Sequence, residues 1–469
     1  MAATAHRHRK RRRRIIGFEA AVAWLKGPEK AMGEMENAPD LVHAKRGSGR
    51  GDFFAIDQRL WGLVCAQGMT AAVAYLVLAR GTGPDQRTSS WSVNAITKYT
   101  GIGIPRAKQA ITKLSQAGLI RVVRKGSRPR YHLVPAHEVP GCDAYPRPVL
   151  SVKEKQAFER LMKGYQPISF ETIDEVVRWG WARKEGDGRY VPLPFDAEAA
   201  VKPDWIWLPN ALVDGVRGNQ AAPVELVRQT QNVAIMRLLI DLYYEHNLTS
   251  DGGIHWRRIQ KKFTREKVGQ WRDFVVYKFS PANQISWRDA PFVKRFLTGE
   301  QVPVEGSNHQ EDRGLRLFWA AWEQLLGFGL IEIVGHVVEA DAADAEIIHP
   351  LAFDEGQEAE RRLGMAARSA AEAMLSPDQL AGIERDSYLV PVKAHMAGVQ
   401  MVGIARLRYR PRTSATSTWY SRMAKWGAWA EKYDRLASEA RSERSEVGNA
   451  LQHQGSQGRY PATSRYVKA

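Results

Sequence analysis

Hydrophobic and polar positions in the first third of the chain change from a helical period to a strand period. Apolar runs over 70–80 and 92–99 predict two helices. In a third helix, starting near Gly103, apolar residues at i, i+4 and i+7 predict one buried stripe. Gly118 then ends the helical period, and residues 119–134 predict a β-hairpin. The predicted order is therefore three helices followed by a hairpin.

The exposed face of the third predicted helix carries amide, hydroxyl and cationic side chains. At 100° per residue these side chains point away from the buried stripe, and such groups suit base edges and phosphates together. The hairpin loop is also cationic, as in loops that lie along a phosphate backbone or enter the minor groove. The candidate DNA-binding residues are Arg106, Lys108, Gln109, Thr112 and Lys113 on the helix and Arg124, Lys125, Arg128 and Arg130 in the hairpin.

The segments Tyr99-Thr-Gly-Ile and Ala117-Gly-Leu-Ile enclose a stretch that resembles the core of bacterial winged helix-turn-helix proteins. In that family the recognition helix is followed by the same Leu-x-x-x-Gly-Leu-Ile step. The resemblance covers about 65 of the 469 residues, and it implies docking in the major groove of double-stranded DNA. The chain departs from the family at Gly103, where Ser or Thr usually caps the helix. Glycine at this position lowers the stability of the helix by only a few tenths of a kcal/mol.

A second segment repeats the spacing of the first and predicts a second winged helix. Its exposed helix positions are apolar, for example Leu317 and Trp319, and its wing is acidic. Phosphate would repel such a wing, whereas an apolar face prefers protein. We therefore predict a degenerate copy that packs internally or forms a homodimer. The matching positions are Ala110, Leu114, Gly118 and Leu119 in the first segment and Ala321, Leu325, Gly329 and Leu330 in the second.

The charge of the chain changes this picture by pointing to a polyanionic partner. The formal net charge is +17, which favours nucleic acid. Between Asp85 and Glu138 there are ten Lys or Arg residues and no acidic residue. A winged helix that contacts only protein would show mixed charge on its exposed face.

A second basic stretch, 404–425, interleaves arginines with aromatic residues. Alternating arginines on one strand face suit single-stranded nucleic acid or a phosphate backbone. A solvated strand face beside an ordinary core explains the pattern equally well. The residues of this secondary patch are Arg406, Arg408, Arg410, Arg412 and Arg422.

Other classes of protein find little support in the composition. The two cysteines, Cys65 and Cys142, form no C-x-x-C pair, so we expect neither a disulfide framework nor a zinc site. No apolar run approaches the roughly 18 residues of a membrane span, and no apolar segment follows the basic N-terminus as in a secretory signal. We expect a cytoplasmic, nucleoid-associated protein without a cofactor or metal.

The pattern as a whole predicts an α+β, mainly helical fold with tandem winged helix-turn-helix domains. The second copy is degenerate, and a helical and hairpin extension follows it. The predicted parts are a disordered basic arm and linker (1–52), the DNA-binding domain (53–140), a helical connector (141–203), the second winged-helix-like domain (204–352), a C-terminal helical and hairpin region (353–442) and a disordered tail (443–469).

These features favour a non-enzymatic protein that binds double-stranded DNA. We expect a replication initiator or a transcriptional regulator of a bacterial mobile element, phage or plasmid, because the tandem arrangement resembles that of plasmid and phage initiators. One alternative is a nicking or integrase-type enzyme, which would need a carboxylate cluster or an activated tyrosine within 190–420. Another is a scaffold whose winged helices bind only protein.

Overall fold

The structure of the protein is a computed structural model, and it describes residues 52–457 with short gaps. The predicted arm and linker therefore lie, apart from Asp52, outside the described residues, as does the predicted tail from 458 onward. The gaps within the described range are 127, 145–149, 167–168, 179–180, 186–187, 194–195, 217–220, 248–251, 288–289, 305–307, 343–344, 353–355 and 397.

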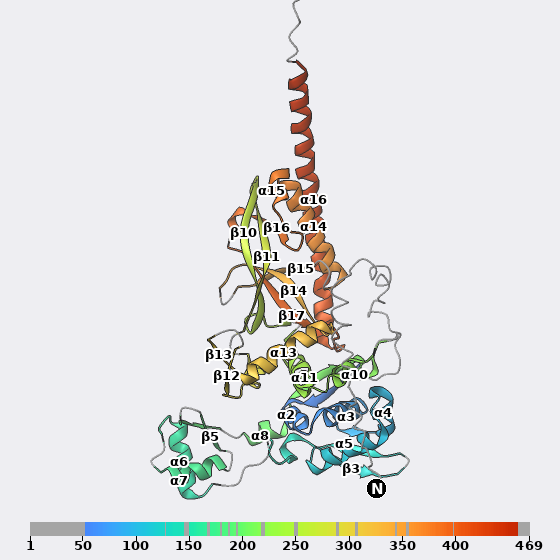
Figure 1. The fold of residues 1–469 in the computed structure, drawn as a ribbon, viewed down its shortest axis with the longest axis vertical. Helices are drawn as coiled ribbons and strands as arrows, with labels where there is room; N and C mark the ends of the chain where they lie inside the picture. The colour runs from blue at the N-terminus through green and yellow to red at the C-terminus, as the bar shows by residue number, and fades with distance from the viewer. Residues whose placement is uncertain are drawn as a thin grey trace, which may run out of the picture. The chain divides into compact units, whose positions relative to one another are not determined.

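The first part of this range contains four helices, three of which pack around the fourth, α3 (Figure 1). Every residue from Ala71 to Ala79 on α3 is buried, as expected of a helix that is apolar on all sides. Gly101 ends the helix before the predicted recognition helix in the left-handed region, at φ +65°. The four helices are α2 (Gln58–Ala66), α3 (Met69–Arg80), α4 (Val93–Thr100) and α5 (Ile104–Gln116).

The two strands after α5 join a short strand that precedes α4 in a small three-stranded sheet. Gly118 turns the chain at φ +71°, and the N–H of Leu119 donates to the carbonyl of Leu114 at 2.9 Å, which closes the end of the helix. The sheet has the order β2-β4-β3. The helices and the hairpin predicted for 70–134 are thus present. The elements are β2 (Thr88–Ser89), β3 (Ile120–Arg124), β4 (Arg130–Leu133) and the 3-10 turn η2 (Ala136–Glu138).

The first strand pairs with one that lies about 150 residues later in the sequence. Strand β1 (Phe53–Asp57) is antiparallel to β7 (Trp205–Pro209), and the indole N–H of Trp61 donates to the carbonyl of Arg237 at 3.2 Å. One hydrophobic cluster extends from Phe54 to Leu407. The core of the first predicted domain is therefore continuous with helices of the second. Those helices are α9 (Ala211–Asp214), α10 (Pro223–Gln229), α11 (Val233–Glu245), α12 (Pro291–Lys294) and α13 (Arg313–Gly327).

The segment between these parts forms a small unit with its own hydrophobic cluster, built on Leu161, Ile173 and Val176. It was predicted to be a helical connector, and it contains a β-hairpin as well as helices. Its elements are α6 (Val152–Met162), α7 (Phe170–Arg178), β5 (Ala182–Lys184), β6 (Tyr190–Pro192) and α8 (Ala197–Val201).

The later part of the chain is built on a six-stranded antiparallel sheet of order β15-β14-β17-β10-β11-β16 (Figure 1). Two helices, α14 (Glu358–Met374) and α16 (Ser414–Gln457), pack against each other and share a hydrophobic cluster with the sheet. The strands are β10 (Ile259–Trp271), β11 (Phe274–Trp287), β14 (Ile331–Val338), β15 (Ile347–Leu351), β16 (Tyr388–Lys393) and β17 (Gln400–Leu407).

The predicted fold class, a mainly helical protein with tandem winged helices, is therefore wrong. The second copy does contain the helix–Gly–strand junction, because α13 leads through Gly329 into β14. However, β14 lies between β15 and β17 inside the large sheet and is not part of a two-stranded wing. Its second partner comes from more than 60 residues later in the chain, and a local repeat carries no information about such a partner.

Two expectations for the C-terminal region are also corrected. The hairpin predicted within the C-terminal region (353–442) is absent from its described part: the strands β16 and β17 do not pair with each other, since β16 pairs with β11 at the sheet edge. The last helix continues to Gln457, into the segment predicted to be a disordered tail. The remaining described elements are β8 (His246–Asn247), β9 (Gly253–Ile254), β12 (Gln301–Pro303), β13 (Gln310–Asp312), α15 (Pro377–Ala381) and the 3-10 turn η3 (Ala394–Met396).

Candidate nucleic-acid interface

Helix α5 is amphipathic, and its buried side fixes which residues face solvent. Gly103 precedes it in an extended conformation, and Pro105 occupies its first turn, where the missing N–H costs no helical hydrogen bond. Ala107, Ile111 and Leu114 are buried and belong to the same cluster as α3. The opposite side of α5 is consequently held away from the core.

All five predicted residues of α5 lie on its exposed side. The hydroxyl of Thr112 donates to the carbonyl of Lys108 at 3.1 Å, which leaves its oxygen lone pairs and methyl group free to meet a partner. The structure thus brings the predicted helix residues together on one element. The exposed residues are Arg106, Lys108, Gln109, Thr112 and Lys113.

The hairpin of β3 and β4 presents a second group of exposed cations. Arg124 stands directly opposite Arg130 in the β-ladder, an arrangement in which like charges destabilise the pair. Lys125 and Arg128 lie in the loop between the strands and are exposed as well. A bound anion would remove the repulsion between the two arginines.

The cations of α5 and the hairpin together form what we call the basic surface. None of them has a carboxylate within 4 Å among the residues that the structure describes. Nearby cations behave differently, because Arg121 pairs with Glu138 at 3.1 Å and Arg87 with Asp57 at 3.6 Å. The members of the basic surface are Arg106, Lys108, Lys113, Arg124, Lys125, Arg128 and Arg130.

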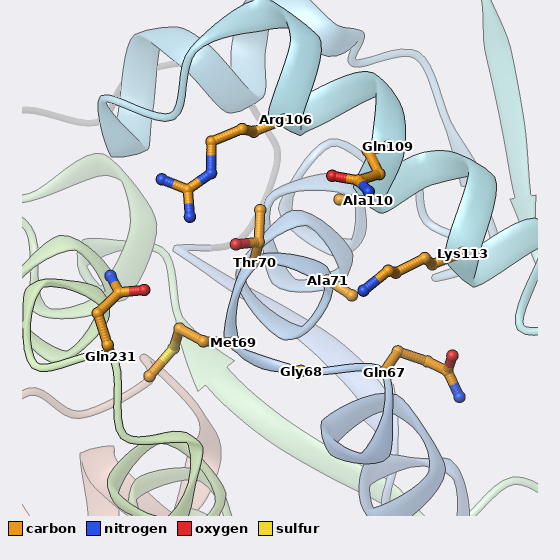
Figure 2. Close-up of a pocket in the computed structure, with 10 residues that line it drawn as sticks. All are labelled: Gln67, Gly68, Met69, Thr70, Ala71, Arg106, Gln109, Ala110, Lys113 and Gln231. Atoms are coloured by element: carbon orange, nitrogen blue, oxygen red, sulfur yellow. The ribbon is translucent and has the colours of Figure 1, made fainter.

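Part of the basic surface lines a cavity of about 310 Å³ between α5 and the start of α3 (Figure 2). We call it the α3–α5 cavity. Helix α3 begins there at Gly68, whose φ is +93°, without a side-chain cap. The local sequence pattern does not indicate that α5 passes over the start of α3, so the cavity was not predicted. Its lining residues are Gln67, Gly68, Met69, Thr70, Ala71, Arg106, Gln109, Ala110, Lys113 and Gln231.

A second cavity, of about 760 Å³, lies beside α11 and has compensated charges. Its two arginines, Arg258 and Arg295, both pair with the buried carboxylate of Glu245. Burial raises the pKa of the neighbouring Asp241 to about 6, although Arg295 and Arg237 act in the opposite direction. The cations of this cavity are therefore engaged inside the protein.

The predicted secondary patch is wrong for its central residues. Arg406 is fully buried, and one of its terminal nitrogens lies 2.8 Å from both carboxylate oxygens of Glu360. Arg410 is almost fully buried, 3.2 Å from Glu332, and its guanidinium lies 4.3 Å from the centre of the Trp419 ring. Helix α14 supplies the carboxylate of Glu360 to the strand face that was expected to meet solvent.

The outer members of that patch do reach the surface, but separately. Arg408 is exposed after the end of β17, and Arg422 is exposed on α16. Arg412 is half-exposed and pairs with Asp52 at 2.7 Å. One sequence signal pointed to the buried pair, since Glu360 lies on the same helix stripe as the apolar Leu363.

Other kinds of site find no support in the described part of the chain. No group of three or more His, Cys, Asp or Glu side chains there is placed to hold a metal ion. Among the described helices, none combines the length and apolar character that crossing a bilayer requires. No protein-family model, curated protein or solved structure matches this chain.

Proposed function

We propose that the protein binds double-stranded DNA, with α5 in the major groove and the β3–β4 hairpin against the phosphate backbone. A helix with its side chains is about 10–12 Å wide, and the major groove of B-DNA is about 12 Å wide. The observation that carries the proposal is the basic surface, whose cations lack carboxylate partners in the described chain. Such cations are free to replace the counterions of DNA.

The repulsion between Arg124 and Arg130 supports the same partner. Two guanidiniums opposite each other on a hairpin weaken it in isolation, so their presence is understandable if an anion lies between or beside them. The hydroxyl and methyl group of Thr112 add groups that recognise base edges. An interface for a protein surface of mixed charge would gain little from an uninterrupted set of cations.

The proposal covers DNA binding and, as its consequence, association of the protein with DNA in the cell. The expectation of a replication initiator relied on a tandem pair of winged helices, and the second member of that pair is absent. Initiation and transcriptional regulation both remain predictions from the sequence, to be separated by footprinting on the locus that the protein binds.

The salt dependence of binding tests the proposal directly. If six cations of the basic surface meet phosphates, the logarithm of the association constant falls with the logarithm of salt concentration at a slope of about −5. Fluorescence anisotropy with a labelled duplex at several salt concentrations measures this slope. A slope near −1 would contradict extensive backbone contact.

Charge reversal in the hairpin gives the matched test. The double variant Lys125→Glu/Arg128→Glu should bind duplex DNA at least about tenfold more weakly, equivalent to about 1.4 kcal/mol. The control Arg361→Glu/Arg362→Glu makes the same change in net charge on the exposed side of α14. Equal losses in the two variants would mean that only the overall charge matters, and the proposed surface would then be wrong.

A further inference from the structure

The α3–α5 cavity is lined by hydrogen-bond donors and, among the described residues, by no carboxylate. Arg106 and Lys113 contribute only donors, whereas Gln109, Thr70 and Gln231 contribute groups that can donate. Its apolar lining consists of small or flexible residues, with no aromatic ring on which a base or drug-like ligand would stack. The lining therefore suits a small anion better than an apolar ligand.

The two cations of the cavity come from one stripe of α5. Arg106, Gln109 and Lys113 are spaced at i, i+3 and i+7, so they share one flank of the helix. Figure 2 shows Arg106 and Lys113 extending from α5 toward the start of α3, on either side of Thr70. Their positive charges face a common space, and an anion in that space would be attracted by both.

Close packing of the two helices holds this arrangement in place. Ala110 of α5 and Ala71 of α3 are both buried where the helices meet. Small side chains at a contact let helix axes approach closely. The cavity is thus framed by two packed helices, and its lining includes the first turn of α3, which has no side-chain cap and carries the partial positive charge of a helix N-terminus.

The second cavity provides an internal comparison. There, Arg258 and Arg295 are already paired with Glu245, so an incoming anion would have to displace a buried carboxylate. In the α3–α5 cavity no such carboxylate lies within ion-pairing distance of Arg106 or Lys113 in the described chain. The two cavities differ in whether their cations remain available.

We infer that the α3–α5 cavity binds a phosphate group, most directly a backbone phosphate of the DNA whose groove α5 enters. This inference rests on the proposed DNA binding for the source of the phosphate, and free phosphate is the other source of the same chemistry. It divides the helix residues by role. Arg106, Gln109 and Lys113 position the protein on the backbone, while Lys108 and Thr112, on the other flank, face the base edges.

Neutralising the two cations of the cavity tests whether the bound phosphate belongs to DNA. The variant Arg106→Gln/Lys113→Gln should weaken binding by a similar factor for all duplex sequences and, because one phosphate contact is lost, reduce the salt slope by about 1 in magnitude. Lys108→Ala should instead change the relative affinities for different sequences. The matched control, Arg361→Gln/Arg362→Gln on α14, should leave the slope of the full-length protein unchanged.

Inorganic phosphate alone tests whether the cavity binds a free phosphate ion. At constant ionic strength, phosphate should raise the melting temperature of the wild-type protein and of the α14 control relative to chloride, because a ligand that binds the folded state stabilises it. It should raise the melting temperature of Arg106→Gln/Lys113→Gln less, because only the general stabilisation of folded proteins by phosphate salts remains. Gln109→Glu, which introduces a carboxylate into the cavity, should abolish the extra stabilisation without removing either cation.

The outcomes separate this inference from the proposed function. A smaller salt slope in the cavity variant than in the wild type supports a DNA phosphate. If the salt slope is unchanged but phosphate raises the melting temperature more in the wild type than in the cavity variant, a free anion is supported. If neither change occurs while the wild type binds DNA, the cavity inference is overturned and the proposed function stands. If the wild type does not bind DNA, the proposed function fails, and the melting temperatures alone decide whether the cavity binds phosphate.

Discussion

Arg406 shows how a single residue can connect several elements. Its guanidinium contacts Glu360 of α14 and, at 3.2 Å, the Nε2 atom of His336 on β14. His336 accepts that hydrogen bond only when Nε2 carries no proton, and its Nδ1 lies 2.8 Å from the carbonyl of Val334. Burial, and then the charge of Arg406, hold the pKa of His336 well below its ordinary value.

This environment makes stability depend on pH in a definite direction. The folded His336 has a lower pKa than the unfolded one, so its contribution is present above about pH 6.5 and is lost as the pH falls below that value. Burial lowers the pKa of His349 to about 4, with the same sign. Both histidines are therefore neutral in the folded protein at neutral pH.

We predict that His336→Gln loses less stability on acidification than the wild type does. Between about pH 6.5 and about pH 5 the difference should be about 1.6 kcal/mol, because one unit of pKa corresponds to about 1.36 kcal/mol and the unfolded histidine is already half protonated at about pH 6.5. Urea unfolding at the two pH values measures it, with His395→Gln at an exposed position as the control. An unchanged pH dependence in His336→Gln would show that this histidine does not titrate on unfolding.

The misinterpretation of Arg406 has a physical cause. Alternation along 404–410 indicates which side chains share a strand face, but it does not indicate whether another element covers that face. The covering helix, α14, lies more than 40 residues earlier in the chain. An acidic residue on its apolar stripe, Glu360, was the one sequence signal for a buried partner.

At the level of elements, glycines in two helices face very different surroundings. A Cβ on Gly364 of α14 would lie 2.1 Å from the carbonyl oxygen of Ala352, so this helix packs directly on the backbone that follows β15. A Cβ on Gly427 of α16 would meet no atom within 4 Å. Both glycines lie inside helices, where alanine has the higher intrinsic propensity.

Replacing each by alanine should therefore change stability in opposite directions. Gly427→Ala should stabilise the protein by about 0.5–1 kcal/mol, whereas Gly364→Ala should destabilise it by about 1–3 kcal/mol through overpacking. Chemical denaturation of the two variants provides the measurement. A stabilising effect at both positions would show that α14 is not packed as closely as described.

The sequence predicted the elements of 70–134 because their signals are local. The stop at Gly118 and the change of period after it both lie within about 15 residues of the helix that they end. The same kind of signal identified α13 and β14. The signal did not show how these elements assemble, because the pairing of β14 with β17 depends on residues far along the chain.

The whole molecule is joined by contacts between distant parts of the chain. Residues 53–57 pair with 205–209, and Lys261 on β10 pairs with Gly403 on β17. A prediction that divides the chain into consecutive domains cannot find such pairs, because the local pattern of 53–57 does not identify the strand with which it pairs. The order of strands in the large sheet was beyond sequence reasoning for the same reason.

This organisation leads to a prediction about fragments. A fragment of residues 53–140 lacks β7 and the helices α10 and α11 that complete its core, so it should not show a cooperative unfolding transition. Circular dichroism during heating tests this, with the full chain as the reference. A sharp transition in the fragment would indicate a module that folds independently of β7.

The pairing of β1 with β7 also sets the time at which the proposed DNA-binding elements can form during synthesis. Residues 53–140 leave the ribosome well before 205–245, which complete their core. At about 5–20 residues per second, the roughly 100 intervening residues take about 5–20 s to translate. During that interval the apolar helix α3 has no cover on the side of α11. The nascent chain is then a natural client for chaperones, and the proposed DNA-binding elements become complete only when the later helices have been made.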